Sequence, residues 1–171
     1  MQVNIEFSKN NFKKYDLNKI KERLKDVSKP LGDFEKYYRG LIKTNFYRSG
    51  EIFGKWPPLS EKYLKRKKKM VAKGEIMGNG LKAKRLEILR LTDDLRKKTF
   101  DDNNVKIDNN SIIYKVNTIY ANTHQYGRGN IPARPFLFTN AEKGLRQVDK
   151  DLLIKIIAKY LIQEQDFKNE G

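Results

Sequence analysis

Residues 105–116 read Val-Lys-Ile-Asp-Asn-Asn-Ser-Ile-Ile-Tyr-Lys-Val, and this stretch decides the class of fold. Two segments that alternate apolar and polar side chains, Val105–Ile107 and Ile112–Val116, flank four short polar residues. Alternation with a period of two indicates strands that bury one face, and Asp-Asn-Asn-Ser supplies residues typical of tight turns. The sequence therefore predicts a β-hairpin here.

Most of the remaining chain has the period of an α-helix. Apolar residues recur at helical spacing over 17–27, behind the candidate N-cap Asp16, and again over 31–46, with Pro30 expected to break or kink the chain between them. The stretch 145–161 has the clearest apolar stripe in the chain. Further helices are expected over 61–73, behind Ser60, and over 118–126.

Two more segments are expected to extend the sheet. Residues 1–8 alternate around Ile5, and residues 131–138 are held extended by Pro132 and Pro135. We therefore predict an α+β fold. A small antiparallel sheet, formed by the hairpin with N-terminal and C-proximal strands, packs against two to four helices, and the last helix is long. The 171 residues suit a single domain, 1–171.

The charge is large and uneven. The chain carries a formal net charge of +16, and residues 61–98 hold fourteen Lys or Arg against five Asp or Glu. Because residues 61–85 also contain three glycines and few apolar anchors, we expect them to form a flexible basic arm or loop. Such a segment suits nucleic acid or an acidic protein partner, although a merely solvated lysine-rich face is an equal alternative. The cations expected to face that partner are Lys62, Lys65, Arg66, Lys67, Lys68 and Lys69.

Several classes of chemistry are excluded or disfavoured. The chain has no cysteine and one histidine, His124, so disulfides, thiol catalysis and paired-histidine metal sites are excluded. The adjacent carboxylates Asp93 and Asp94 suit a helix start after the candidate cap Thr92 better than catalysis. No apolar run nears the roughly 20 residues that cross a bilayer, and residues 1–8 lack a secretory apolar region. We expect no catalytic residue, metal or cofactor, no membrane partner, and folding in a cytoplasm.

Two motifs carry a more specific signal. Residues 53–60 read Phe-Gly-Lys-Trp-Pro-Pro-Leu-Ser and precede the basic stretch. Residues 120–127 read Tyr-Ala-Asn-Thr-His-Gln-Tyr-Gly and lead to Ile-Pro-Ala-Arg-Pro-Phe-Leu over 131–137. In this order, with a hairpin between them, the motifs resemble the phage virion-morphogenesis family, also called tail-completion proteins. The resemblance covers about residues 34–161.

The resemblance implies a non-enzymatic structural protein of the virion, assembled in the host cytoplasm and located at the head–tail junction. It would complete or terminate the tail as a homo-oligomeric ring around the DNA path, for which a hexamer is one arrangement. Its partners would be neck, connector and tail-tube proteins and, as an open alternative, the passing DNA without sequence specificity. The rival hypothesis is a basic nucleic-acid-binding protein of a phage or mobile element.

The motif side chains have physical roles that suit either packing within the chain or contact with a neighbour. Trp56 can pin the loop beside it by burying a large ring, Arg134 can pair with a carboxylate of an adjacent subunit, and His124 is expected to be structural. The candidate motif and interface residues are Trp56, Pro57, Pro58, Leu59, Tyr120, His124, Gln125, Gly127, Pro132, Arg134, Pro135, Phe136 and Leu137.

The sequence departs from the family pattern at one turn. The family has Thr-Gly in a segment where this chain reads Leu91-Thr92-Asp93-Asp94-Leu95, so a capped helix is expected to replace that turn. Residues 73–85 look like an inserted loop.

Overall fold

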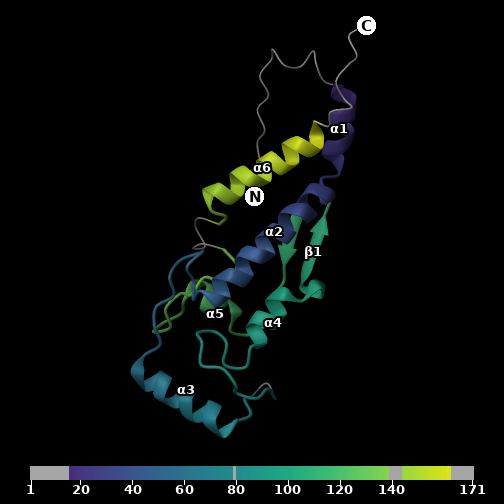
Figure 1. The fold of residues 1–171 in the computed structure, drawn as a ribbon. Coiled ribbons are helices and arrows are strands. Elements are labelled where there is room, and N and C mark those ends of the chain that lie inside the picture. Colours follow the sequence, from purple (N-terminus) through teal and green to yellow (C-terminus); the bar gives the residue numbers. More distant parts are fainter. Residues whose placement is uncertain (1–15, 79, 139–143, 163–171) are drawn as a thin grey trace.

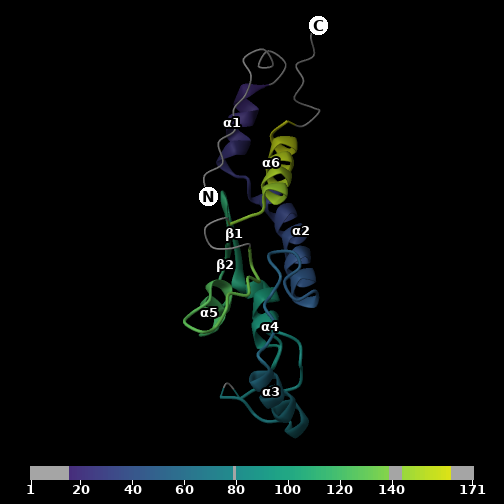
Figure 2. The same ribbon diagram turned by 90° about the vertical axis from the view of Figure 1, so that its left-hand side faces the viewer.

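A computed structural model describes residues 16–78, 80–138 and 144–162. The described part is elongated, with α1 (Leu17–Lys25) and α6 (Gln147–Leu161) at one end and α3 (Glu61–Lys73) at the other (Figures 1 and 2). The predicted α+β class is confirmed: helices surround a small antiparallel sheet.

The long helix α2 (Ser28–Tyr47) forms the spine of the core. Its buried face presents Phe34, Tyr38, Ile42 and Phe46, each four residues from the next, and α6 packs along the helix. Pro30 does not interrupt this helix, contrary to expectation. It lies in the first turn, where backbone N–H groups have no partner within the helix, so a residue without an N–H is tolerated.

The first helix, α1, begins where the sequence predicts. Asp16 caps α1, accepting hydrogen bonds from the amides of Asn18 at 3.0 Å and Lys19 at 3.3 Å. The chain turns between α1 and α2 at Val27, whose amide donates to the Asn109 carbonyl at 2.8 Å. The junction of the two helices is thereby tied to the turn of the hairpin.

The hairpin is confirmed. Strand β1 (Val105–Asp108) pairs with β2 (Ser111–Tyr114) in register Val105 to Tyr114, which leaves Asn109 and Asn110 as a two-residue turn. The hairpin lies against α2, where the Tyr114 hydroxyl donates to Glu35 Oε1 at 3.0 Å. The short 3₁₀ helix η2 (Asp102–Asn104) leads into it.

The rest of the predicted sheet differs. The predicted N-terminal strand lies outside the described residues, and the predicted C-proximal strand over 131–138 is wrong, because the sheet of the described residues contains β1 and β2 alone. The described residues form six α-helices in all, and the short helices α4 (Asp94–Phe100) and α5 (Ala121–Tyr126) lie where short helices were expected.

Candidate functional site

The two sequence motifs, about 75 residues apart in the chain, meet in the structure. The indole N–H of Trp56 donates to the Pro135 carbonyl at 2.7 Å. In return, the Arg134 guanidinium donates to the carbonyls of Pro57 at 3.2 Å and Pro58 at 3.3 Å. Trp56 is 3% exposed and its ring meets that of Phe46 edge to face, with centroids 5.7 Å apart. Trp56 therefore holds its loop to the second motif, as predicted, and Arg134 binds carbonyl groups of its own chain.

Asn45 joins both motifs, and sequence reasoning missed it. Its side-chain amide donates to the Pro135 carbonyl at 3.0 Å, and its Oδ1 accepts from the amides of Ile52 and Phe53 at 3.1 and 3.0 Å. The residue is 0% exposed. A polar residue amid the apolar stripe of α2 was the available signal, because a buried amide has to be hydrogen-bonded.

Gln125 organises the second motif from within. Its Oε1 accepts from the amides of Phe136 and Leu137 at 3.0 and 3.1 Å, while its Nε2 donates to the Phe138 carbonyl at 2.9 Å. The Tyr38 hydroxyl donates to the Leu137 carbonyl at 2.8 Å. These side chains satisfy backbone groups that a neighbouring strand would otherwise bind, which explains why residues 131–138 do not join the sheet.

Gly127 closes the turn between α5 and this extended segment. Its φ is +78°, and a Cβ at this position would lie 2.9 Å from the Ala133 amide nitrogen. Glycine is therefore required for both conformation and space. The close approach lets the Arg134 amide donate to the His124 carbonyl at 2.6 Å.

His124 lies in a poorly solvated position. Its ring meets that of Tyr120 at 5.8 Å, and its buried Nδ1 has no hydrogen-bond partner among the described residues. Burial, assisted by the nearby Arg134 charge, lowers the pKa of His124 to about 4. The imidazole is thus neutral at pH 7. Tyr120 is fixed in turn by a hydrogen bond from its hydroxyl to Asp94 Oδ2 at 3.1 Å.

A cavity of about 860 Å³ opens beside the joined motifs, between α3 and the segment that contains α5. Five parts of the chain contribute to its lining: residues 58–60, α3, residues 77–78, residues 89–95 and residues 119–134. Of the predicted site residues, the lining includes Pro58, Leu59, Lys67, Tyr120, His124, Pro132 and Arg134. Trp56, Gln125 and Phe136 lie instead in the buried core behind it, where each is at most 3% exposed.

Helix α3 matches its predicted bounds. Ser60 caps it, accepting from the Tyr63 amide at 3.3 Å, and Gly74 ends it in the left-handed conformation. Five of its predicted partner-facing cations are exposed, and none of the five forms an ion pair within the part of the chain that the structure describes: Lys62, Lys65, Arg66, Lys68 and Lys69.

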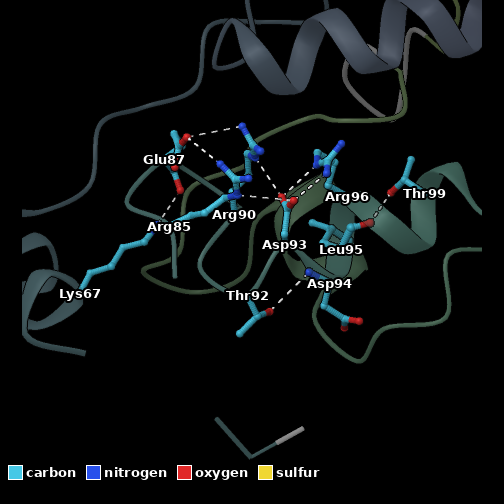
Figure 3. Close-up of polar contacts among 10 residues, drawn as sticks. All are labelled: Lys67, Arg85, Glu87, Arg90, Thr92, Asp93, Asp94, Leu95, Arg96 and Thr99. Atoms are coloured by element: carbon cyan, nitrogen blue, oxygen red, sulfur yellow. Dashed lines mark hydrogen bonds and ion pairs between the residues drawn. The ribbon is translucent and has the colours of Figure 1, made fainter. Parts of the chain in front are cut away.

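The prediction for Lys67 is wrong. Lys67 is 2% exposed, and its ammonium group donates to the Glu87 carbonyl at 2.6 Å. Figure 3 shows its side chain reaching from α3 toward the loop that precedes α4. Burial lowers the pKa of Lys67 to about 8. The ammonium group thus holds α3 to the loop instead of facing a partner.

That loop contains a buried ion network centred on Asp93. Asp93 accepts from Arg90 Nε at 2.9 Å and from Arg96 Nη2 at 2.6 Å (Figure 3). Burial by itself would raise the pKa of Asp93, but the hydrogen bonds and charges of the two arginines outweigh it and hold the pKa well below its usual value. Asp93, not Thr92, is the N-cap residue of α4.

Asp93 also has the backbone conformation of a glycine. Its φ is +65° and ψ is 9°, in the left-handed region. The expected helix is present as α4, and it begins directly after this left-handed residue; aspartate is among the residues that tolerate this region. The two arginine pairs offset the strain of a side chain at a position that suits glycine.

Over the described residues, no group of three or more His, Cys, Asp or Glu side chains is placed to hold a metal ion. Within the same residues, no helix is long and apolar enough to cross a membrane.

Comparison with known proteins gives one informative match. No protein-family model matches the chain, and no solved structure matches it. An uncharacterized protein of Methanocaldococcus jannaschii, MJ0331, is 38% identical over 111 residues, which are 63% of this chain and 68% of that protein. This extent of identity and coverage shows common descent: the chain belongs to the same family as MJ0331.

Proposed function

We propose that this chain is a non-enzymatic structural protein of a tailed-phage particle or a phage-derived element, acting at the head–tail junction to complete or terminate the tail. The observation that supports this best is the contact between the two motifs that resemble tail-completion proteins. Trp56 and Arg134 hydrogen-bond reciprocally to Pro135 and to Pro57 and Pro58. Residues that carry the resemblance thus form one unit, as expected if they were selected together.

The chemistry of this unit suits a scaffold. The polar side chains of Asn45, Gln125 and Arg134 bind backbone amides and carbonyls. A side chain engaged in this way fixes the path of the chain and is poorly placed to transfer protons. A rigid unit beside an open cavity is what an assembly contact requires, since preorganisation lowers the entropy lost on binding.

A ring would give the basic face of α3 a role. Figures 1 and 2 place α3 at one end of the molecule, away from α1 and α6. Five exposed cations there would be repeated around the ring, either toward acidic neck, connector or tail-tube proteins or toward the DNA path. Weak contacts repeated in this way add to strong binding through multivalency.

The same face supports a second candidate function, non-specific nucleic-acid binding by the isolated subunit. Cations without an internal counter-charge are the groups that release counterions from a phosphate backbone. Aromatic stacking contributes little to this candidate, because Tyr63 is the one aromatic residue within α3.

Deletion of the gene from the phage or element that encodes it tests the first function. We expect DNA-filled heads and tails that fail to join, or tails of abnormal length, by electron microscopy, with joining restored by the wild-type gene in trans. Infectious particles of normal form without the protein would refute the proposal. Tight, salt-sensitive DNA binding by the purified subunit, together with normal particles, would support the second candidate instead.

A further inference from the structure

The cavity beside the joined motifs contains two buried cations with no carboxylate bound to them. Lys67 is 2% and Arg134 is 6% exposed, and both line the cavity. Lys67 donates to the Glu87 carbonyl and Arg134 to the carbonyls of Pro57 and Pro58. Among the described residues, neither forms an ion pair within 4.0 Å. The chain therefore buries two positive charges whose hydrogen-bond acceptors are neutral carbonyl groups.

This arrangement is unfavourable for the isolated subunit. A buried charge without a counter-charge is costly, and the nearby Arg134 charge further disfavours the charged form of Lys67. The Glu87 carboxylate favours charged Lys67, but it is engaged by Arg85 at 3.7 Å and Arg90 at 3.5 Å. A bound anion in the cavity would relieve the imbalance.

Donors remain for such an anion. An ammonium group has three N–H donors and a guanidinium five, so the carbonyl contacts leave several N–H groups of Lys67 and Arg134 unused. His124 adds a third polar group to the cavity wall, since its buried Nδ1 has no partner in the described part of the chain.

The rest of the cavity and its rim are apolar. Leu59, Leu89 and Leu91 line the interior. Around the opening, Ile119 is 100% exposed and Ile131 is 45% exposed. An isoleucine fully in water gains stability only when something covers it. A small anion would fill the charged part and leave this rim in water, whereas a peptide would cover both.

We propose that this cavity binds a short acidic peptide segment of a partner protein, with an Asp or Glu carboxylate on Lys67 and Arg134 and apolar neighbours over Ile119 and Ile131. Charge complementarity favours this occupant. Helix α3, which contributes Tyr63 and Lys67 to the lining, also carries five exposed cations, and these would attract a segment that carries further acidic residues. Nucleic acid suits the cavity less well, because a phosphate backbone could meet the cations but would leave the apolar walls and rim uncovered.

The inference rests on the proposed assembly function for the existence of a partner, but its test needs only the purified full chain. A displayed library of random dodecapeptides is selected against the wild-type chain, and the strongest binder is synthesised with a fluorescent label. Binding is measured by fluorescence anisotropy, with a second peptide in which Asp and Glu become Asn and Gln.

Two variants and two matched controls locate the binding. Lys67→Met keeps the buried stem and removes the charge, and Lys65→Met makes the same change on the exposed face of α3. Ile119→Glu alters the rim at a fully exposed position, and Val148→Glu does so on α6, where Val148 is 58% exposed. Ile119→Glu keeps the test valid if Lys67→Met fails to fold.

We expect selected peptides to combine an acidic residue with Leu, Ile or Phe. Affinity should fall about tenfold or more with Lys67→Met, Ile119→Glu and the neutralised peptide, and stay within about twofold for both controls. The proposal is wrong if no peptide is enriched, if the enriched peptides lack acidic residues, or if Lys65→Met weakens binding as much as Lys67→Met. An oligonucleotide that binds the wild-type chain and loses affinity in Lys67→Met and Ile119→Glu would overturn it in favour of nucleic acid. None of these results depends on whether the gene deletion blocks head–tail joining.

Discussion

Replacement of Trp56 by alanine should destabilise the fold severely. The ring is 3% exposed and packs edge to face on Phe46, and its N–H donates to the Pro135 carbonyl. Truncation of a buried aromatic side chain costs about 3–5 kcal/mol in free energy of unfolding. The lost hydrogen bond should not push the loss above this range, because Asn45 still donates to the Pro135 carbonyl.

The variant Trp56→Phe separates the two contributions. It keeps a ring beside Phe46 but has no N–H donor, so it should cost about 1–2 kcal/mol: roughly 1 for the hydrogen bond and the rest for the smaller ring. Tyr47→Ala is a matched aromatic control at the last residue of α2, next to Phe46 in the sequence. Tyr47 is 58% exposed, so its removal should cost under about 1 kcal/mol.

Urea melts followed by far-UV circular dichroism give these free energies, since the chain has no other tryptophan to report by fluorescence. A loss below about 1 kcal/mol for Trp56→Ala would refute the reasoning. It would mean that the ring does not hold the two motifs together in solution.

Three further predictions follow from charges in the structure. Asp93→Asn keeps a residue that tolerates positive φ but breaks the buried ion pair with Arg90, which then keeps only the partly exposed Glu87 at 3.5 Å, so the free energy of unfolding at pH 7 should fall by about 3 kcal/mol. Folding lowers the pKa of Asp93, so its ionised carboxylate stabilises the fold fully above about pH 4, which is the pKa of the carboxyl group in the unfolded chain. The difference in free energy of unfolding between wild type and variant, measured by urea melts, should therefore narrow as the pH falls below 4. A difference that stays constant would contradict the ion-pairing role of Asp93. His124 has a pKa of about 4 in the fold against 6.5 for the free side chain, so neutral imidazole favours the fold. The free energy of unfolding of the wild type should decline from pH 6.5 toward pH 4, and His124→Gln should reduce that decline. Equal pH dependence in the two proteins would show that the imidazole is solvated. Substitution of four exposed lysines by glutamine should shift the melting temperature by a few degrees at most, because each exposed change costs under about 0.5 kcal/mol, and should impair head–tail joining; normal particles would reduce the charge to a solvated face. The four are Lys62, Lys65, Lys68 and Lys69.

Elements with local signals were predictable from the sequence. The hairpin turn at Asn109 and Asn110, and the bounds of α3 between Ser60 and Gly74, depend on residues within a few positions of one another. Turn and cap residues act through their own backbone and that of near neighbours. Such features do not depend on the rest of the fold.

Features that depend on residues far away in the sequence were either missed or predicted incorrectly. Asn45 binds the Pro135 carbonyl across 90 residues, and no pattern in α2 identifies that acceptor. Lys67 resembles its exposed lysine neighbours in sequence, yet the loop before α4 covers it. The two prolines of the segment 131–138 favour an extended chain, but the side chain of Gln125 occupies backbone groups that a strand would need.

The reciprocal contact between the motifs also bears on how the chain folds during synthesis. The Trp56 indole and the Pro135 carbonyl are 79 residues apart, and Arg134 and Pro57 are 77 apart. At translation rates of about 5–20 residues per second, this interval takes roughly 4–16 s. Throughout it, the apolar stripe of α2 has neither Phe136 nor α6 to cover it. Nascent chains that stop before residue 135 should therefore aggregate or bind chaperones, and full-length chains should fold late, after release from the ribosome.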